Sequence, residues 1–487
     1  MSLNSPTFLF LFLPIFLLIF TLIGKRLRVY TLILFSVIFL LWSDPLFAPF
    51  IFTLVVLNFI LLTAIQKVPT LSSQRSHRLN FSIGINLFAL LAFKIISTYG
   101  QDFLSWVELS QITIPQWVVT YLPLLAHLPL GLSFLTFQAI SMLVDGSRQD
   151  NKDEISLLSV SNYLLLFPKL ISGPILRFHE TAAQLKQPSS DPSQVADGVR
   201  RFMLGFIKKT MVADQLALIT DRGIFNQAPA NIPPGVAWLI ILCYTLQIYI
   251  DFSSYSDMAI GLGQVLGFRF PENFNFPYIS ASISEFWRRW HMTLSNWFRD
   301  YVFYPLERKR RVLRWLTQPV NILLVFLLTG LWHGITPPFI VWGLLHGLAI
   351  AIEHTRIGNW QRSLWKPIQN MYTLSVIIVG WVFFRSSSLA YAWNFIKSLF
   401  GFNHPLSDIP FSVLPPISPF VWAALVISIF LSFPVLPALQ KRFSIIYSFN
   451  ERPWLGWCRD GLLLGLFALG IMFQAGTSYQ PFLYGGF

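Results

Sequence analysis

The stretch "PTFLFLFLPIFLLIFTLIGKRLR", residues 6–28, decides the class of fold. Its apolar part, residues 6–24, is close to the roughly 20 residues with which a helix crosses a bilayer. No basic residue precedes this run and no small-residue cleavage site follows it, so the pattern does not indicate a signal peptide. We expect a retained first transmembrane helix. Lys25, Arg26 and Arg28 follow it directly and predict an extracytoplasmic N-terminus.

The composition of the whole chain supports a membrane protein. Of its 487 residues, 54% are hydrophobic and 12% are charged, against about 25% charged residues in a typical soluble protein. The formal net charge of +13 does not indicate nucleic-acid binding, because the basic residues form short clusters between apolar runs, as in cytoplasmic loops of membrane proteins. The two cysteines are too few for a disulfide framework or a structural zinc site. We expect one membrane-embedded domain, residues 1–487, in the cytoplasmic (inner) membrane.

The loops between the first apolar runs alternate in charge, as expected if they alternate between the cytoplasmic and the extracytoplasmic side. The loop at 66–78 is basic and is predicted to be cytoplasmic, whereas the loop at 101–111 has acidic residues and no Lys or Arg. The fold class is therefore all-α and polytopic, with roughly ten transmembrane helices. The apolar runs after the first are residues 30–43, 46–65, 80–98, 119–143, 234–250, 319–335, 338–353, 371–384, 418–437 and 459–475.

One apolar segment does not fit a simple span. Residues 155–172 are interrupted by Pro168 and lie between polar segments, 145–154 and 173–201, that both favour the cytoplasmic side. We predict a re-entrant element here. Irregular backbone at membrane depth needs shielding by protein or by a water-filled cavity, so this segment also indicates a central funnel.

The stretch "SISEFWRRWHMTLSNWFRDYVFYPL", residues 282–306, concentrates tryptophan, arginine and histidine. Ser282 and Glu285 form a capping-box pattern, which predicts that a helix begins near Ile283. At about 100° per residue, its polar side chains fall on one stripe. Periodicity alone favours an interfacial helix, and the alternative is a helix whose stripe faces an internal cavity. Its members are Arg288, His291, Ser295 and Arg299.

Two histidines interrupt later apolar segments. His333 lies in "LLTGLWHGITPPF", residues 327–339, and His346 lies in the middle of the next run. The ordinary explanation for such a residue is a buried, hydrogen-bonded histidine. The alternative is general-base chemistry on a hydroxyl, because the unperturbed pKa of histidine is about 6.5. No Cys, Asp or Glu stands at ligand spacing around them, so no metal site is expected.

A second polar cluster is "LQIYIDFSSYSDMAIGLG", residues 246–263. Gln247, Asp251 and Asp257 lie here beside a predicted span, where carboxylates are costly unless they are paired. We expect pairing with Arg288, Arg289 or Arg299, and a supporting, structural role for the cluster.

Together these residues resemble the membrane-bound O-acyltransferase family, in its bacterial branch of alginate and peptidoglycan O-acetyltransferase membrane subunits. The matching motifs run in order from residue 128 to residue 385. They are "LPLGLSFLTFQAISMLVD" (128–145), "FPKLISGPI" (167–175), "GFIKKTMVAD" (205–214), "IDFSSYSDMAIGLGQVLGFRFPENFNFPY" (250–278), "SEFWRRWHMTLSNWFRDYVFYPL" (284–306), "GLWHG" (330–334), "WGLLHG" (342–347) and "GWVFFR" (380–385).

The resemblance implies a ring of helices around a funnel, with His333 as the catalytic histidine and His291 as a second important one. Trp332, in the same motif as His333, is a supporting candidate. The expected donor is acetyl-CoA or another acyl thioester from the cytoplasm, with no bound cofactor. The expected acceptor is an extracytoplasmic polysaccharide, reached through an SGNH-type acetyltransferase partner.

Alternatives remain open at this point. Within the family, D-alanyl transfer from a carrier protein to teichoic acid-type polymers is possible, although the chain continues well past residue 385, which favours acetyl transfer. In a different class, the histidines would relay protons in a transporter. The C-terminal "PFLYGGF", residues 481–487, resembles an aromatic F-x-Y-x-x-F tail. Tyr484 would then accept the acyl group, or would be an interfacial anchor.

Overall fold

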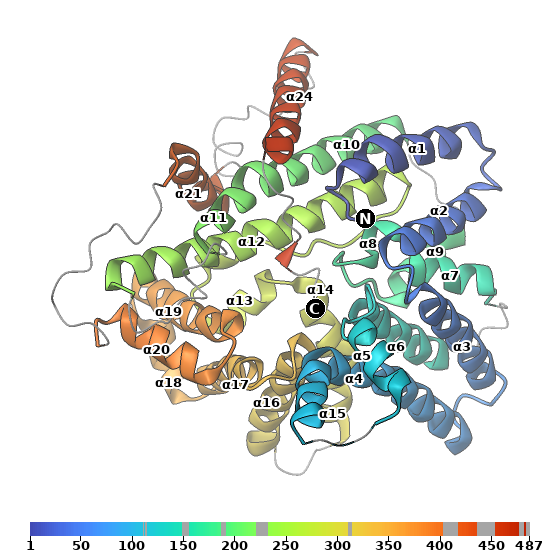
Figure 1. The fold of residues 1–487 in the computed structure, drawn as a ribbon, viewed down its shortest axis with the longest axis horizontal. Helices are drawn as coiled ribbons and strands as arrows, with labels where there is room; N and C mark the ends of the chain where they lie inside the picture. Colours follow the sequence, from blue (N-terminus) through green and yellow to red (C-terminus); the bar gives the residue numbers. More distant parts are fainter. Residues whose placement is uncertain are drawn as a thin grey trace. The chain divides into compact units, whose positions relative to one another are not determined.

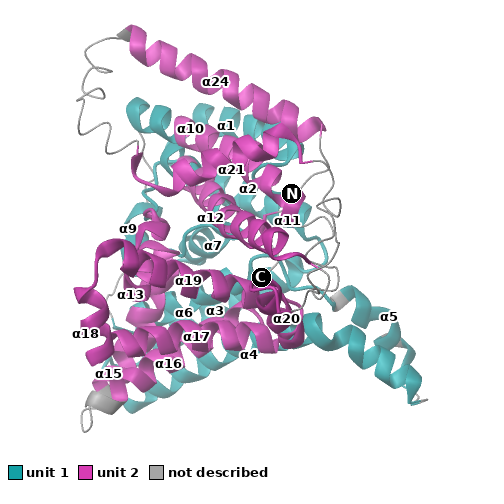
Figure 2. Cartoon of the chain, turned by 90° about the vertical axis from the view of Figure 1, so that its left-hand side faces the viewer, with its two compact units in different colours: residues 1–198, 262–271, 484–487 teal, residues 199–261, 272–483 magenta. Residues whose placement is uncertain are grey.

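The computed structural model is helical, and no strand occurs in the ranges that it describes (Figure 1). The chain divides into two compact units (Figure 2). Unit 1 contains residues 1–198 and 262–271, and unit 2 contains residues 199–261 and 272–483. The all-α prediction is confirmed, whereas the single domain remains a prediction. The described residues are 1–110, 112, 114–148, 155–186, 191–220, 232–309, 314–402, 417–435, 453–476 and 482–483.

Unit 1 is built on phenylalanine packing among its N-terminal helices. The ring of Phe167 lies 5.1 Å from that of Phe16 and 5.3 Å from that of Phe12. A buried amide pair, Asn58 and Asn86, joins α3 to α4 through reciprocal hydrogen bonds of 3.0 and 2.9 Å. The elements of this part are η1 (Phe8–Phe12), α1 (Leu13–Leu22), α2 (Arg28–Ser43), α3 (Ala48–Gln66), α4 (Ser73–Leu109), α5 (Gln116–Leu125), α6 (Leu132–Arg148), α7 (Leu157–Leu165), α8 (Phe167–Leu170), α9 (Phe178–Lys186) and the start of α10 (Pro192–Ile207).

The predicted span 119–143 is wrong as a single helix, because α5 ends at Leu125 and α6 begins at Leu132. Gly131 between them has φ +71°, in the left-handed region, and an added Cβ there would lie 2.3 Å from the Leu170 carbonyl oxygen. The Asp44 carboxylate fixes the same break by accepting a hydrogen bond of 2.9 Å from the Leu130 N–H. Residues 155–172 form the two short helices α7 and α8, and the re-entrant element there remains a prediction.

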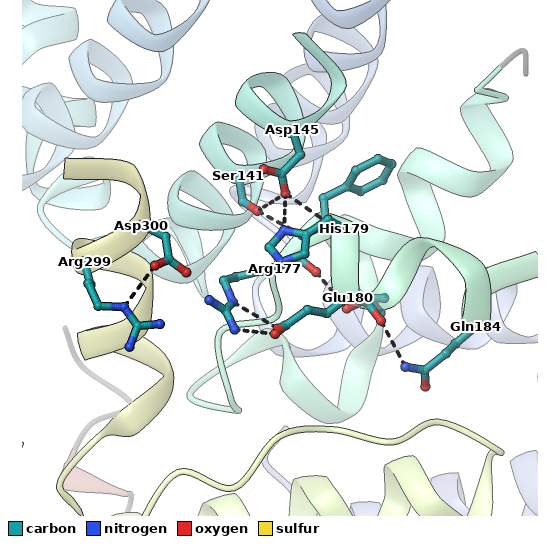
Figure 3. A network of polar contacts seen from close by, with 10 residues as sticks. Ser141, Asp145, Arg177, His179, Glu180, Gln184, Arg299 and Asp300 are labelled. Carbon is teal, nitrogen blue, oxygen red and sulfur yellow. Dashed lines mark hydrogen bonds and ion pairs between the residues drawn. The ribbon is translucent and has the colours of Figure 1, made fainter. Parts of the chain in front are cut away.

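A polar network in unit 1 holds the start of α9 against α6 (Figure 3). The Asp145 carboxylate accepts from the His179 backbone N–H at 3.1 Å and contacts its Nδ1 at 2.9 Å. The Ser141 hydroxyl oxygen accepts from the Phe178 N–H at 2.9 Å. These contacts satisfy first-turn N–H groups of α9, so we interpret this Ser, Asp and His set as structural.

Unit 2 contains a long helix, α12 (Pro234–Val265), which extends well beyond the predicted span 234–250. Asp251 and Asp257 therefore lie on this helix and not after it. The other elements of unit 2 are η2 (Lys208–Ala213), α11 (Asp214–Thr220), η4 (Pro277–Ile279), α13 (Ile283–Arg289), α14 (Met292–Phe298), η5 (Arg299–Phe303), α15 (Tyr304–Lys309), α16 (Arg314–His333), α17 (Pro337–Glu353), α18 (Arg356–Ser363), α19 (Lys366–Arg385), α20 (Leu389–Leu399), α21 (Pro419–Ser432) and α24 (Pro453–Gly476).

Several helices are suited to cross a membrane. Among the described residues, five are long and apolar enough, and α17 with α18 would form a sixth span bent by 80°. Further apolar helices are shorter, at residues 8–22, 28–43 and 419–432. The chain is a multi-pass membrane protein, while the count of ten spans remains a prediction. The five long helices are α3, α4, α12, α19 and α24.

Glycines bring α16 and α17 into direct backbone contact. An added Cβ at Gly330 would lie 2.5 Å from the Phe339 carbonyl oxygen, and one at Gly343 would lie 2.3 Å from that of Phe326. Small residues allow this approach, as they commonly do between membrane helices. The motifs "GLWHG" and "WGLLHG" therefore contain both the glycines of this helix contact and the histidines, His333 and His346, whose positions depend on it.

Candidate active site

His333 is the last residue of α16 and is 3% exposed. Aromatic rings surround its imidazole. The centroid distances are 4.5 Å to Trp332, 5.0 Å to Trp342 and 5.0 Å to Phe384. Gly334 and the pair Pro337–Pro338 end α16 and start α17, so the chain turns directly after His333. The result is a buried imidazole at a helix end, surrounded by aromatic rings.

His346 also packs against Trp342, whose ring is 5.2 Å from it. The indole N–H of Trp287 donates to His346 Nδ1 at 3.3 Å. An ideal Cβ at Gly380 would lie 2.8 Å from His346 Nε2, so α19 approaches this ring closely because residue 380 has no side chain. His346 thus has the ordinary role of a buried, hydrogen-bonded histidine in the aromatic core.

The predicted helix from Ile283 to the region of Pro305 is wrong, because it breaks at His291. One half of the predicted capping box is present, with the Ser282 hydroxyl oxygen accepting from the Glu285 N–H at 3.0 Å, whereas the Glu285 carboxylate accepts from the Ala281 N–H at 2.9 Å. However, α13 ends at Arg289, and His291 has φ 43° and ψ 52° in the left-handed region. Such a conformation is uncommon for a residue with a side chain and persists only where the surroundings impose it.

The neighbours of His291 explain its conformation. Its Nδ1 lies 3.0 Å from the amide oxygen of Asn273, and the Met292 N–H donates to the Asn273 backbone carbonyl at 2.9 Å. The Phe252 ring lies 4.7 Å from the imidazole, at nearly a right angle. His291 is fully buried and outside the helices that are long enough to cross a membrane. Burial lowers its pKa to about 3, so the imidazole is neutral near pH 7.

Trp332 connects the two predicted site histidines. Its ring is 4.5 Å from that of His333 and 6.3 Å from that of His291. All three side chains are buried and belong to unit 2. The structure therefore brings together His291, Trp332 and His333, which are 42 residues apart at their extremes. Two buried histidines packed on one tryptophan suit proton transfer and hydrogen bonding to a bound substrate.

The predicted pairing of the carboxylates with Arg288, Arg289 or Arg299 is wrong. Lys209 lies between Asp251 at 2.8 Å and Asp214 at 2.7 Å, and Lys209 and Asp251 are both almost fully buried. The physical reason is that α12 is continuous, so Asp251 faces η2 and α11.

Asp257 pairs with Arg201 at 3.0 Å and Lys208 at 2.9 Å. Gln247 accepts a hydrogen bond of 2.5 Å from the Thr220 hydroxyl. Arg289 instead pairs with Glu285, and Arg299 with Asp300.

A cavity of about 690 Å³ opens beside α13, α14 and α16. Although the helix of the predicted stripe is broken, three of the stripe residues, Arg288, Ser295 and Arg299, line this cavity, and His291 does not. Both arginines are exposed. The apolar part of the wall includes Trp287, Ile322, Val325 and Phe326, and Thr329 lines it one helical turn before His333.

Sequence reasoning missed Asn273 and Lys209, although both stand inside quoted motifs. Asn273 belongs to "FPENFNFP", residues 270–277, and Lys209 to "GFIKKTMVAD". Neither periodicity nor spacing marks them, because their partners come from distant parts of the chain. The signal that was available for Lys209 was a charged residue in an apolar segment, which needs a partner.

The C-terminal segment reaches the Lys209 cluster. The Leu483 N–H donates to Asp251 at 2.8 Å. The ammonium of Lys209 lies 4.6 Å from the centre of the Phe482 ring, which packs edge-on against Tyr255 at 5.0 Å. Tyr484 lies outside the described residues.

Comparison with known proteins agrees with this site. A profile of the membrane-bound O-acyltransferase family matches residues 39–393. The chain belongs to this family. It is 34% identical over 493 residues to a probable alginate O-acetylase AlgI of Pseudomonas putida, with 99% of each chain covered. It is 29% identical over 531 residues to the peptidoglycan O-acetyltransferase of Helicobacter pylori, covering 99% of this chain and 97% of that protein.

A third relative aligns over a smaller part. The teichoic acid D-alanyltransferase of Bacillus subtilis is 29% identical over 268 residues, which are 52% of this chain and 66% of that protein. The family match makes the chain an acyltransferase, and the full-length relatives are acetyltransferases by name. The motif-based resemblance is confirmed.

Proposed function

We propose that this enzyme moves an acetyl group from a cytoplasmic thioester, acetyl-CoA or a similar donor, toward an extracytoplasmic polysaccharide. The observation that carries the proposal is the buried His291, Trp332 and His333 group, close to a cavity with arginines at its edge. The names of the full-length relatives support acetyl as the group transferred.

The cavity at α13, α14 and α16 suits a thioester donor. Its volume of about 690 Å³ lies within the range of small-molecule sites. The exposed guanidinium groups of Arg288 and Arg299 favour phosphate, to which arginine binds with two parallel hydrogen bonds. The Ser295 hydroxyl adds a polar group farther along the wall. The apolar remainder suits the arm that carries the acyl group, and the basic segment 307–314 favours anions at the cytoplasmic side.

In the proposed reaction His333 is the general base. It takes the proton of the acceptor hydroxyl while the hydroxyl oxygen attacks the thioester carbonyl carbon. The carbon–sulfur bond breaks, and the protonated His333 returns the proton to the leaving thiolate. One ester and one thiol are formed, and no oxidant or metal is needed. His291 positions the substrates or polarises the donor carbonyl.

The remaining predicted residues have supporting roles in this proposal. Trp332 separates and orients the two histidines. Asp251, Asp257 and Gln247 hold α12 to neighbouring elements through contacts with Lys209, Arg201 and Thr220, respectively. This positions Phe252, which packs on His291.

The acceptor side of the reaction involves the C-terminus and a partner. We propose that Tyr484 takes the acyl group first and passes it to an extracytoplasmic SGNH-type acetyltransferase. Support comes from the preceding residues, Phe482 and Leu483, which are anchored beside the buried Asp251. We further propose that the protein lies in the inner membrane, with an extracytoplasmic N-terminus that the loop charges support.

The experiment that tests the function is O-acetylation of cell-envelope glycan in cells that carry His333→Ala or Tyr484→Phe. The matched control is His77→Ala, because His77 is exposed on α4 and its ring hydrogen-bonds locally to Ser73, one helical turn away. We expect glycan acetylation to disappear in His333→Ala and to be unchanged in His77→Ala at equal expression. Normal acetylation in His333→Ala would refute the catalytic role.

Two other functions give different results in simple assays. D-alanyl transfer, which the Bacillus subtilis relative represents by name, would attach D-alanine and would require a carrier protein and not acetyl-CoA. A proton-coupled transporter would carry solute into liposomes without forming any ester. Ester formation from acetyl-CoA excludes both.

A further inference from the structure

The side chain of Asn273 joins α12 to the strained corner at His291. It is 1% exposed. Its amide nitrogen donates to the Ser256 hydroxyl on α12 at 3.1 Å. Its amide oxygen accepts from the Thr293 N–H at 3.3 Å and from the Thr293 hydroxyl at 2.8 Å, and it lies 3.0 Å from His291 Nδ1. One buried amide therefore contacts the long helix, the imidazole and the first turn of α14.

These contacts fix which atoms carry hydrogen. A backbone N–H can only donate, so the Asn273 atom that faces the Thr293 N–H is the amide oxygen. The same oxygen faces His291 Nδ1, and an amide oxygen can only accept. Nδ1 therefore carries the hydrogen. A neutral imidazole with hydrogen on Nδ1 has its lone pair on Nε2.

The backbone around His291 is held by the same segment. The Met292 N–H donates to the Asn273 carbonyl, and the Asn275 N–H donates to the Arg289 carbonyl, both at 2.9 Å. Residues 273–275 thus bind the chain on each side of the left-handed residue. A conformation of this kind is maintained by its surroundings and is commonly associated with function.

We propose that Asn273 is a positioning residue that fixes His291 in its Nδ1–H form, so that His291 offers an accepting nitrogen to the acyl-transfer reaction. This inference rests on the proposed function and decides between the two roles left open for His291. Polarising a thioester carbonyl requires a hydrogen-bond donor, which Nε2 in this form is not. His291 therefore positions a substrate by accepting a hydrogen bond from one of its O–H or N–H groups.

The decisive variant is Asn273→Asp. It keeps an accepting oxygen at the same place but puts a negative charge beside Nδ1, which stabilises the imidazolium and raises the pKa of His291. The rings of Phe252 and Trp332 also pack against His291, and neither ring titrates. With a raised pKa, His291 becomes protonated at a higher pH than in the wild type. Once it is protonated, Nε2 carries a hydrogen and can no longer accept a hydrogen bond.

The assay is transfer of labelled acetyl from acetyl-CoA to endogenous glycan in inside-out membrane vesicles, measured against pH with the full-length protein. We expect Asn273→Asp to retain activity at high pH. As the pH is lowered, it should lose activity at a higher pH than the wild type does. Asn273→Ala should lower the rate on the order of 10- to 100-fold. In a His291→Gln background, Asn273→Ala should change the rate by less than about twofold, because the imidazole that Asn273 positions is gone.

The control for lost stability is Asn58→Ala, which removes half of the buried amide pair with Asn86 in unit 1. It should lower the thermal unfolding midpoint and leave the pH profile unchanged. An Asn273→Asp profile that superimposes on the wild type would overturn the inference, even if His291→Gln leaves no measurable rate. Full activity in His291→Gln would instead refute the proposed role of His291 itself, so the two failures are distinguishable.

Discussion

Substituting Gly343 by alanine tests whether the contact between α16 and α17 sets the geometry at His333. The added Cβ would lie 2.3 Å from the Phe326 carbonyl oxygen and 3.3 Å from the Gly330 Cα. Both are backbone atoms, which cannot rotate away as the end of a side chain can. Since carbon and oxygen atoms in close-packed interiors are normally about 3.4 Å or more apart, the helices must separate by roughly 1 Å.

A separation of this size moves residues from both helices relative to each other. His333 is on α16, whereas Trp342, which packs against it at 5.0 Å, is on α17. A misplacement of about 1 Å at a reacting group costs on the order of 100-fold in rate. Overpacking in addition destabilises a close-packed interior by about 1–3 kcal/mol. We therefore expect Gly343→Ala to lose most of its acetyl transfer and to unfold at lower temperature.

The assay is acetyl transfer in membrane vesicles together with thermal unfolding of the purified protein in detergent. The matched control is Gly84→Ala on α4, where an added Cβ meets no atom within 4 Å. The control should keep its activity and should not unfold at lower temperature, because alanine favours a helix interior over glycine. A Gly343→Ala protein that is as active and stable as Gly84→Ala would refute the reasoning.

Two further predictions concern the charged residues. Lys209→Met should destabilise the protein by about 3–5 kcal/mol, because it leaves the buried Asp251 without its cation. Lys208→Met should lower the free energy of unfolding by about 1 kcal/mol or less, because Asp257 keeps its ion pair with Arg201. Equal unfolding midpoints for Lys209→Met and Lys208→Met would contradict this difference. Arg299→Ala should raise KM for acetyl-CoA with little change in kcat, because phosphates do not react. The control Arg289→Ala should leave KM unchanged, and a loss of kcat alone in Arg299→Ala would argue against a donor site.

The sequence predicted the site histidines but not their support. His291 and His333 could be singled out because a polar residue in an apolar or aromatic context needs an explanation, and the ordered motifs supplied one. Asn273 could not be found in this way. Its importance depends on four side-chain hydrogen bonds to three residues that approach it only after folding.

The errors in the predicted elements share one cause. Periodicity describes a helix as if the chain were isolated, so residues 283–301 appeared as one amphipathic helix. The Asn273 segment imposes a left-handed residue at position 291 instead. Likewise the carboxylate of Asp44 and the approach of Leu170 to Gly131 divide residues 119–143. These are tertiary contacts that local pattern does not contain.

The sequence by itself determined the membrane class, the all-helical fold and the family, because these follow from hydrophobic run length, charge placement and ordered motifs. Only the tertiary structure decided which cation pairs with each carboxylate, where the aromatic helix breaks, and which nitrogen of His291 carries hydrogen. The physical reason is that a buried polar group is costly unless it finds a partner. The partner is chosen by proximity in the fold, as Lys209 is for Asp251 across 42 residues of chain.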